Sequence, residues 1–89
     1  MKVNIIHPYI SKNPEIGDGV AIVTGTRIHV RNIISYYKLG YTPEDIISEI
    51  PHLSLAQIYD AFSYYHDHTT EIENEFKLNE SDKAKTLLK

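Results

Sequence analysis

The sequence predicts a mainly α-helical protein, in which an N-terminal β-hairpin precedes a trihelical helix-turn-helix domain with an extended C-terminal helix. All four glycines and all four prolines lie before residue 52, so turns are concentrated in the first half of this 89-residue chain. Two β-rich runs come first, and three segments with helical spacing of apolar side chains follow. Because a chain of this length holds only one small core, we expect an intertwined homodimer.

A glycine-containing turn between two β-rich runs predicts the hairpin. The runs Val20–Val23 and Arg27–Val30 flank the connection Thr24–Thr26, where Gly25 is free to take a positive φ. A lone hairpin is marginally stable in water, so it needs helices or further strands to cover it. The run Ile5–Ile10 could supply another strand, although its proline would confine that strand to an edge.

Two short helices are predicted next. The first has apolar residues at i, i+3, i+4 and i+7, namely Val30, Ile33, Ile34 and Tyr37. Gly40 ends it as a C-terminal cap. The second has Thr42 as N-cap and Pro43 at its first position, and it stops at Pro51.

The third helix begins with the Ser54-x-x-Gln57 pattern of a capping box. Its apolar stripe continues without a glycine or proline, so we expect one helix from Leu55 to about Leu78. The weak point is Thr69-Thr70, because β-branched residues have lower helix propensity. The distal half is amphipathic, so it needs another surface to cover its apolar side.

The three helices make a helix-turn-helix arrangement within a dimerisation and DNA-binding domain of residues 1–66. Its candidate DNA contacts are residues off the core stripe together with two arginines: Arg27, Arg31, Ala56, Gln57 and Ser63. Gln57 could read adenine, whereas Asp60 would repel phosphate and the third helix carries no Lys or Arg. Arg27 has the alternative role of pairing with an acid such as Glu49.

Residues 67–89 are expected to form an extended amphipathic helix and tail that binds a partner. The candidate contact residues are Tyr64, His68, Ile72, Glu75 and Phe76. Ile72 and Phe76 would anchor the helix in a groove, and the acids between them would steer association. The ordinary alternative is a solvated helix face. Tyr37 and Tyr65 fall on core stripes, so they are expected to be packed inside.

Composition excludes several classes of protein. Cysteine is absent, which rules out disulfides and thiolate chemistry. No apolar run has membrane-spanning length and no signal peptide is evident, so we expect a cytoplasmic protein. His66 and His68 lie two residues apart on a helix and cannot share one metal ion. No nucleophile elbow or phosphate loop is present, so we expect neither enzyme activity nor a cofactor.

The net charge of −3 belongs to the C-terminal part of the chain. Residues 1–53 carry five cations and five acids, whereas residues 54–89 carry four cations and seven acids. The chain as a whole is therefore no polyanion binder, and its acidic part suits a basic protein partner.

The chain resembles the family called domain of unknown function 433 over roughly residues 9–76. The resemblance rests on the Gly25-Thr26-Arg27-Ile28 core, the Leu39-Gly40-Tyr41-Thr42-Pro43 segment and the Pro51-His52-Leu53-Ser54 turn. Two departures affect the hairpin: Asp18-Gly19-Val20-Ala21 replaces Gly-Gly-x-Pro, and His29 replaces a proline.

This resemblance implies a small VapB-like helix-turn-helix antitoxin, dimeric through its N-terminal strands and encoded beside a PIN-like ribonuclease toxin. Such nucleases hold a catalytic metal with clustered acids. A tail can inhibit them by covering that cleft or by inserting a charged side chain. We therefore expect an antitoxin that neutralises the toxin and autoregulates its operon through operator DNA. The alternatives are a stand-alone dimeric DNA-binding regulator and an oligomerising scaffold.

Overall fold

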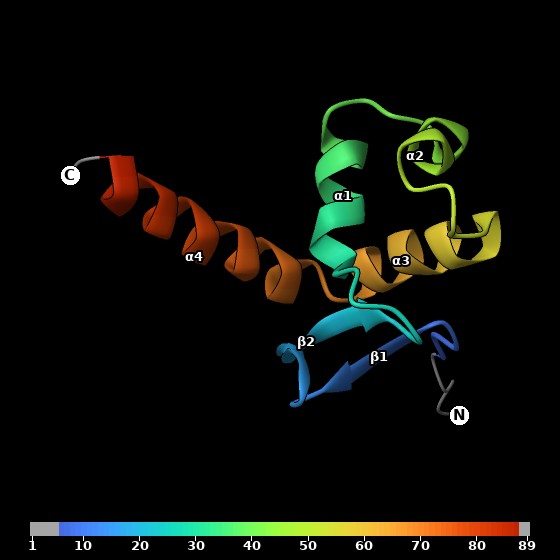
Figure 1. The fold of residues 1–89 in the computed structure, drawn as a ribbon, viewed down its shortest axis with the longest axis horizontal. Coiled ribbons are helices and arrows are strands. Elements are labelled where there is room, and N and C mark those ends of the chain that lie inside the picture. Colours follow the sequence, from blue (N-terminus) through green and yellow to red (C-terminus); the bar gives the residue numbers. More distant parts are fainter. Residues whose placement is uncertain (1–5, 88–89) are drawn as a thin grey trace.

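The computed structural model describes the backbone of residues 6–87 and the side chains of residues 6–16 and 19–78. A two-stranded antiparallel hairpin is followed by four helices (Figure 1). The elements are β1 (Ile10–Asn13), β2 (Ile16–Val23), α1 (Val30–Lys38), α2 (Pro43–Glu49), α3 (Leu55–Asp67) and α4 (Thr69–Leu87). The start of the expected strand at Ile5 and the end of the expected tail at residues 88–89 lie outside the described residues.

β2 pairs with β1, and this corrects the expected pairing of Val20–Val23 with Arg27–Val30. The strands are antiparallel with Ile10 opposite Val23, and a two-residue turn joins them. The expected additional strand Ile5–Ile10 shares only Ile10 with β1, because Pro8 and Tyr9 form a turn and the strand runs from Ile10 to Asn13.

The turn predicted at Gly25 does form. Gly25 has φ +83°, and the Thr26 hydroxyl both donates to a carbonyl of β2 (2.7 Å) and accepts the N–H of Ile28 (3.0 Å). Beyond the turn a single bridge joins Ile22 to His29. The second strand is cut short because α1 begins at the next residue.

The helix ends agree with the sequence prediction. Gly40 has φ +93° directly after α1. The Thr42 hydroxyl accepts the N–H of Asp45 (3.1 Å), and the Asp45 carboxylate accepts that of Thr42 (3.0 Å). Ser54 and Gln57 exchange the equivalent bonds at 3.2 and 2.7 Å. These hydrogen bonds pair backbone N–H groups that a helix start leaves without partners.

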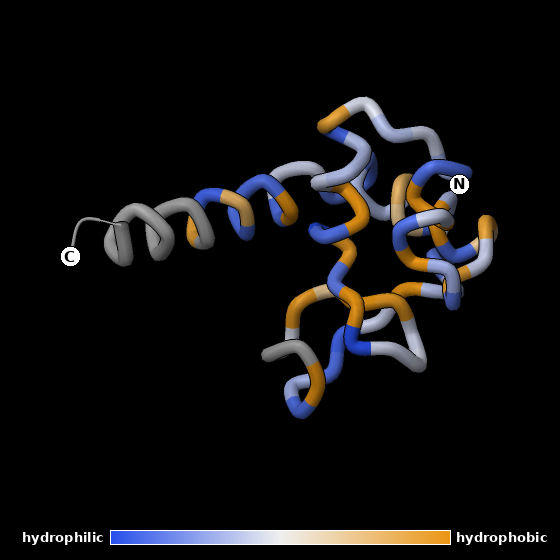
Figure 2. Tube along the Cα trace, turned by 45° about the horizontal axis from the view of Figure 1, so that its top comes forward, coloured by the Kyte–Doolittle hydropathy of each residue, from blue (hydrophilic) through white to orange (hydrophobic). Residues whose placement is uncertain are grey.

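The core lies where α1, α2, α3 and the hairpin meet, and apolar and hydrophilic segments alternate along these elements (Figure 2). Its buried side chains are Ala21, Val23, Val30, Ile33, Ile34, Ile46, Leu53, Ile58, Ala61, Tyr64 and Ile72. Two tyrosines differ from expectation: Tyr64 is only 8% exposed, whereas Tyr37 is 38% exposed. The reason is that α3 turns Ile58 and Tyr64 inward, while Tyr37 packs its ring against Phe62 at the edge of the core (4.6 Å).

The single long helix expected from Leu55 to Leu78 is two helices. The break is at His68, whose φ of −131° and ψ of 44° are not helical. The Thr69 hydroxyl bonds to the carbonyl of Tyr65 (2.9 Å), so the weak point foreseen at the threonines lies beside the break. We call residues 66–69 the elbow.

Beyond the elbow, α4 first packs against α1 and then continues away from the other elements (Figure 1). Ile72, in the first turn of α4, is fully buried and anchors this helix to the core. Within the described residues no helix combines the length and apolar character needed to cross a bilayer.

Ile72→Ala is expected to lower the free energy of unfolding by about 2–5 kcal/mol, because it leaves a cavity in the core. Leu78→Ala, on the exposed side of the same helix, is the control and should change stability by no more than about 0.5 kcal/mol. Urea denaturation followed by circular dichroism measures both. Equal effects would show that the root of α4 is not part of the core.

Candidate functional site

The residues predicted to contact DNA do not form one charged surface. Arg27, Ala56 and Ser63 are exposed. Gln57, the expected adenine reader, uses its side-chain oxygen to accept the N–H of Ser54 at the start of α3. Arg31 turns toward α4 and not toward solvent, since it pairs with a glutamate there. Of the five candidates, Gln57 is therefore used in helix capping and Arg31 in packing α1 against α4.

Three cations of the globular part pair with three carboxylates on the first turns of α4. The ion pairs are Lys12–Glu71 (3.0 Å), Lys38–Glu73 (2.7 Å) and Arg31–Glu75 (3.2 Å). Each pairs a cation of β1 or α1 with α4, so together they fix the direction of the helix. Arg27 has no ion pair among the described residues.

The helical period explains this arrangement. Ile72 and Phe76 lie four residues apart on one face, and the three glutamates flank that face on both sides. Ile72 enters the core, while the Phe76 ring is partly buried with the Lys38 ammonium 4.4 Å from its centre. The pattern that predicted a partner surface is therefore a surface that docks on the protein's own core.

Three of the predicted partner contacts are accordingly buried inside the chain. Tyr64, Ile72 and Glu75 are buried, Phe76 is partly buried, and only His68 is exposed. In the folded chain Ile72 is fully buried in the protein's own core and Phe76 is partly buried against it. An Ile72→Asp variant would place a carboxylate in the core, so it cannot test partner binding separately from folding.

Hydrogen bonds and burial shift the ionisation of these groups. The bond to Glu73 raises the pKa of Tyr65 to about 12, while Lys38, and then Tyr65, lower the pKa of Glu73. Burial raises the pKa of Tyr64, whose hydroxyl donates to Glu71 (2.8 Å). Glu71 and Glu73 are thereby each bound both to a lysine and to a tyrosine of α3.

The outward side of α3 carries an aromatic surface that includes Tyr37, which the sequence predicted to be packed inside. We define it by Tyr37, Tyr59, Phe62 and His66. The ring of Phe62 lies 4.6 Å from that of Tyr37 and 6.4 Å from that of Tyr59, and Tyr59 is 53% exposed. By helical spacing Ala56 and Ser63 lie beside it. This face has no Lys or Arg, so it suits a protein surface better than a phosphate backbone.

α4 offers a second exposed surface past its docked turns. Asn74, Lys77 and Leu78 point away from the core, and Leu78 is 68% exposed. From there the helix runs clear of the other elements to Leu87 (Figure 1). We call residues 77–87 distal α4.

The elbow is marked by an open, polar depression of about 400 Å³ lined by residues 66–71. Its walls are mainly hydroxyl, carboxylate and imidazole groups, and it encloses no apolar volume of the kind that binds small ligands. No group of three or more His, Asp or Glu side chains in the described part of the chain is arranged to hold a metal ion.

These features define a small, mainly helical domain with an N-terminal hairpin. The chain belongs to the family described as "Protein of unknown function (DUF433)", whose model matches residues 10–65. A similar solved structure is that of a DUF433 member from Anabaena variabilis, with 25% sequence identity and a TM-score of 0.70. The match covers 75% of this chain and spans 66% of the length of that one. No curated protein matches the chain.

The buried carboxyl of Glu75 gives a test of this docking. Burial raises its pKa above the ordinary 4.5, and the Arg31 hydrogen bond and charge act against that rise. Arg31→Met is expected to raise the pKa of Glu75 further, whereas Lys12→Met should raise it less, because Lys12 acts only through space. Carbon-13 NMR titration of the carboxyl measures both.

The raised pKa of Glu75 also determines how the stability of the protein changes with pH. A group whose pKa is raised in the folded state binds its proton more tightly there, so its stabilising effect is present below pH 4.5 and lost as pH rises. The Arg31→Met protein should therefore lose more stability than wild type between pH 4.5 and 7. An identical pH dependence in both proteins would contradict the docked position of Glu75.

Proposed function

We propose that this protein is the antitoxin of a type II toxin–antitoxin pair that neutralises a PIN-like ribonuclease. In this proposal residues 6–76 form the folded, dimerising part and the platform for operator autoregulation, and distal α4 is the inhibitory element. The observation that carries the proposal is that α4 docks by its first two turns and then continues as a helix clear of the other elements (Figure 1). A helix exposed in this way is a ready ligand for a groove.

The charge of the C-terminal part supports a particular mode of inhibition. Glu71, Glu73 and Glu75 are engaged by the protein's own cations, so they are not available to steer a basic partner. Residues 77–89 carry four lysines against two acids. This cationic segment complements the clustered acids expected in a PIN-like nuclease. A lysine entering that cleft would compete with the catalytic metal for its carboxylates.

A second candidate is the stand-alone dimeric DNA-binding regulator. The observation in its favour is Arg27, which is exposed on the turn before α1 with no ion pair among the described residues. Against it, Arg31 and Lys38 already pair with carboxylates, and the outward side of α3 is aromatic. Sequence-specific binding would need those cations to be free.

Leu78→Asp in the full-length protein is expected to weaken inhibition of the nuclease encoded by the neighbouring gene by at least about tenfold, because it replaces an exposed apolar side chain of distal α4 with a negative charge. Leu39→Asp is the matched control: Leu39 is 74% exposed at the C-terminal cap of α1, outside distal α4, and should leave inhibition within about twofold. A ribonuclease assay titrated with each variant gives both values. Full inhibition by Leu78→Asp would remove distal α4 from the interface.

Truncation complements the point variants if it is placed correctly. A cut after residue 66 would remove Ile72 from the core, so the cut belongs after Leu78. Residues 1–78 should keep the circular dichroism melting transition and lose inhibition. If full-length protein neither binds nor inhibits the nuclease, and shifts its own promoter DNA, the regulator takes the place of the antitoxin.

A further inference from the structure

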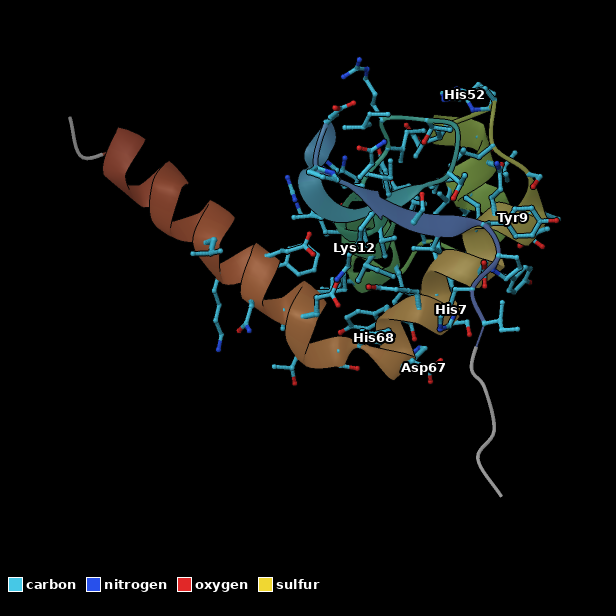
Figure 3. The ribbon with its side chains drawn as sticks, turned by 90° about the horizontal axis from the view of Figure 1, so that it is seen from below. His7, Tyr9, Lys12, His52, Asp67 and His68 are labelled. Carbon is cyan, nitrogen blue, oxygen red and sulfur yellow. The ribbon has the colours of Figure 1, made fainter. Side chains whose placement is uncertain are left out.

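The segment preceding the hairpin crosses α3, and its one histidine is buried there. The His7 side chain is 7% exposed. His7 Nδ1 lies 3.4 Å from Asp60 Oδ1, and His7 Nε2 lies 3.0 Å from Asp67 Oδ2. The two aspartates are seven residues apart, so they lie on one side of α3 two turns from each other. Figure 3 shows His7 beside Asp67 and His68.

The local chain geometry directs His7 to this place. The N–H of Ile10 bonds to the carbonyl of His7 (3.0 Å), which closes a turn with Pro8 at its second position. Proline is favoured there because its φ is fixed near the value that the turn requires. The N–H of Tyr9 then bonds to Asp60 Oδ2 (2.7 Å), so one carboxylate holds both the backbone and the imidazole of the segment.

The donor and acceptor count selects one protonation state of the imidazole. A neutral imidazole has one N–H and one lone pair, whereas an imidazolium has two N–H donors. An ionised carboxylate only accepts hydrogen bonds. In the neutral form one ring nitrogen therefore turns a lone pair toward a carboxylate, in either tautomer. Neither nitrogen of His7 has a well-aligned hydrogen bond in the structure, although both lie within ion-pair distance of an acid.

We propose that His7 is a pH-dependent latch: as an imidazolium it bridges Asp60 and Asp67 and holds residues 6–9 against α3, and on losing its proton it releases that segment. This inference concerns the folded chain alone and does not rest on the proposed antitoxin function. The protonated latch donates one N–H to each carboxylate, whereas the neutral latch has a single N–H to donate and turns a lone pair toward the other carboxylate.

The groups around His7 are consistent with this role. From α3 it is faced by Asp60, Asp67 and the Tyr64 ring (5.2 Å between ring centres), and from the elbow by His68 (6.0 Å). Lys12 of β1 and Glu71 of α4 form the next layer and pair with each other (3.0 Å). The groups in contact with the imidazole thus contribute two carboxylates, and Lys12 is already paired with Glu71.

The test is the pH dependence of amide exchange at Tyr9, whose N–H is held by Asp60. Full-length protein is compared at pH 5.5 and pH 8, where carboxylates stay ionised and an ordinary imidazole changes its charge. After correction for the intrinsic exchange rate, protection of the Tyr9 amide should fall by about tenfold at the higher pH. His7→Gln should have low protection at both values.

Two other histidines serve as controls. His52 is exposed in the turn before α3 and lies far from the latch (Figure 3), so His52→Gln should behave as wild type. His68→Gln distinguishes the latch from its neighbour and should keep the pH-dependent fall. If the fall persists in His7→Gln, or disappears only in His68→Gln, the latch is not His7.

A measurement on the unaltered protein covers the case in which His7→Gln does not fold. The imidazole nitrogen shifts of His7 report its protonation state directly, and the loss of its second N–H should coincide with the fall in Tyr9 protection. Protection that is independent of pH in wild type overturns the proposal.

Discussion

The burial of Ile72 is the constraint on which the C-terminal half depends. In a straight helix Ile72 would lie about 12 Å further along the axis than Tyr64, the last core residue of α3, and would miss the core. The elbow at His68 changes the direction of the chain so that Ile72 is buried where α4 packs against α1. Burying an isoleucine stabilises by about 1.5–3 kcal/mol, whereas a more exposed ion pair such as Lys12–Glu71 or Lys38–Glu73 contributes up to about 1 kcal/mol. Apolar burial thus holds α4, and the three ion pairs orient it.

This constraint divides α4 into two parts with different electrostatics. The docked turns carry acids that meet cations of β1 and α1, so the acidic surplus of the C-terminal half is largely an internal feature of the fold. Distal α4 lies outside that neutralised region, and residues 77–89 have more lysines than acids. A partner that approaches the protruding helix therefore meets a cationic segment and not the acidic run that dominates the composition.

Features set by neighbouring residues could be predicted from the sequence. The caps at Thr42 and Ser54 and the glycine turns depend on local hydrogen bonds and φ angles, and they formed as expected. The partner of β2 could not be predicted, because strand propensity does not choose between a preceding and a following strand. Likewise, amphipathicity showed that the face of Ile72 needs cover, but it does not distinguish the protein's own core from another chain.

The rotation of α3 was ambiguous for a related reason. Apolar residues line both of its sides, Ile58 and Tyr64 inward and Tyr59 and Phe62 outward, so the stripe had no unique direction. One feature of the sequence relates to the His7 contact: Asp60 and Asp67 are seven residues apart on a helix and so share one side of it. Nothing in the sequence connects these two residues with a histidine that lies 53 residues before Asp60.

The position of the latch gives it a mechanical connection to α4. Residues 6–9 contact Asp67, the last residue of α3, and His7 lies within 6.0 Å, ring to ring, of His68 at the elbow. The N-terminal segment and the break in the helix are thus built from the same few side chains. α4 has 19 residues and a length of about 28 Å, so a rotation of about 10° at the elbow displaces its end by about 5 Å. Because side-chain contacts extend over only about 4 Å, a displacement of that size is enough to separate distal α4 from a bound surface. Because Ile72 anchors the root of α4 in the core, such a rotation also moves that side chain, so the His7 latch and the docking of α4 are mechanically coupled.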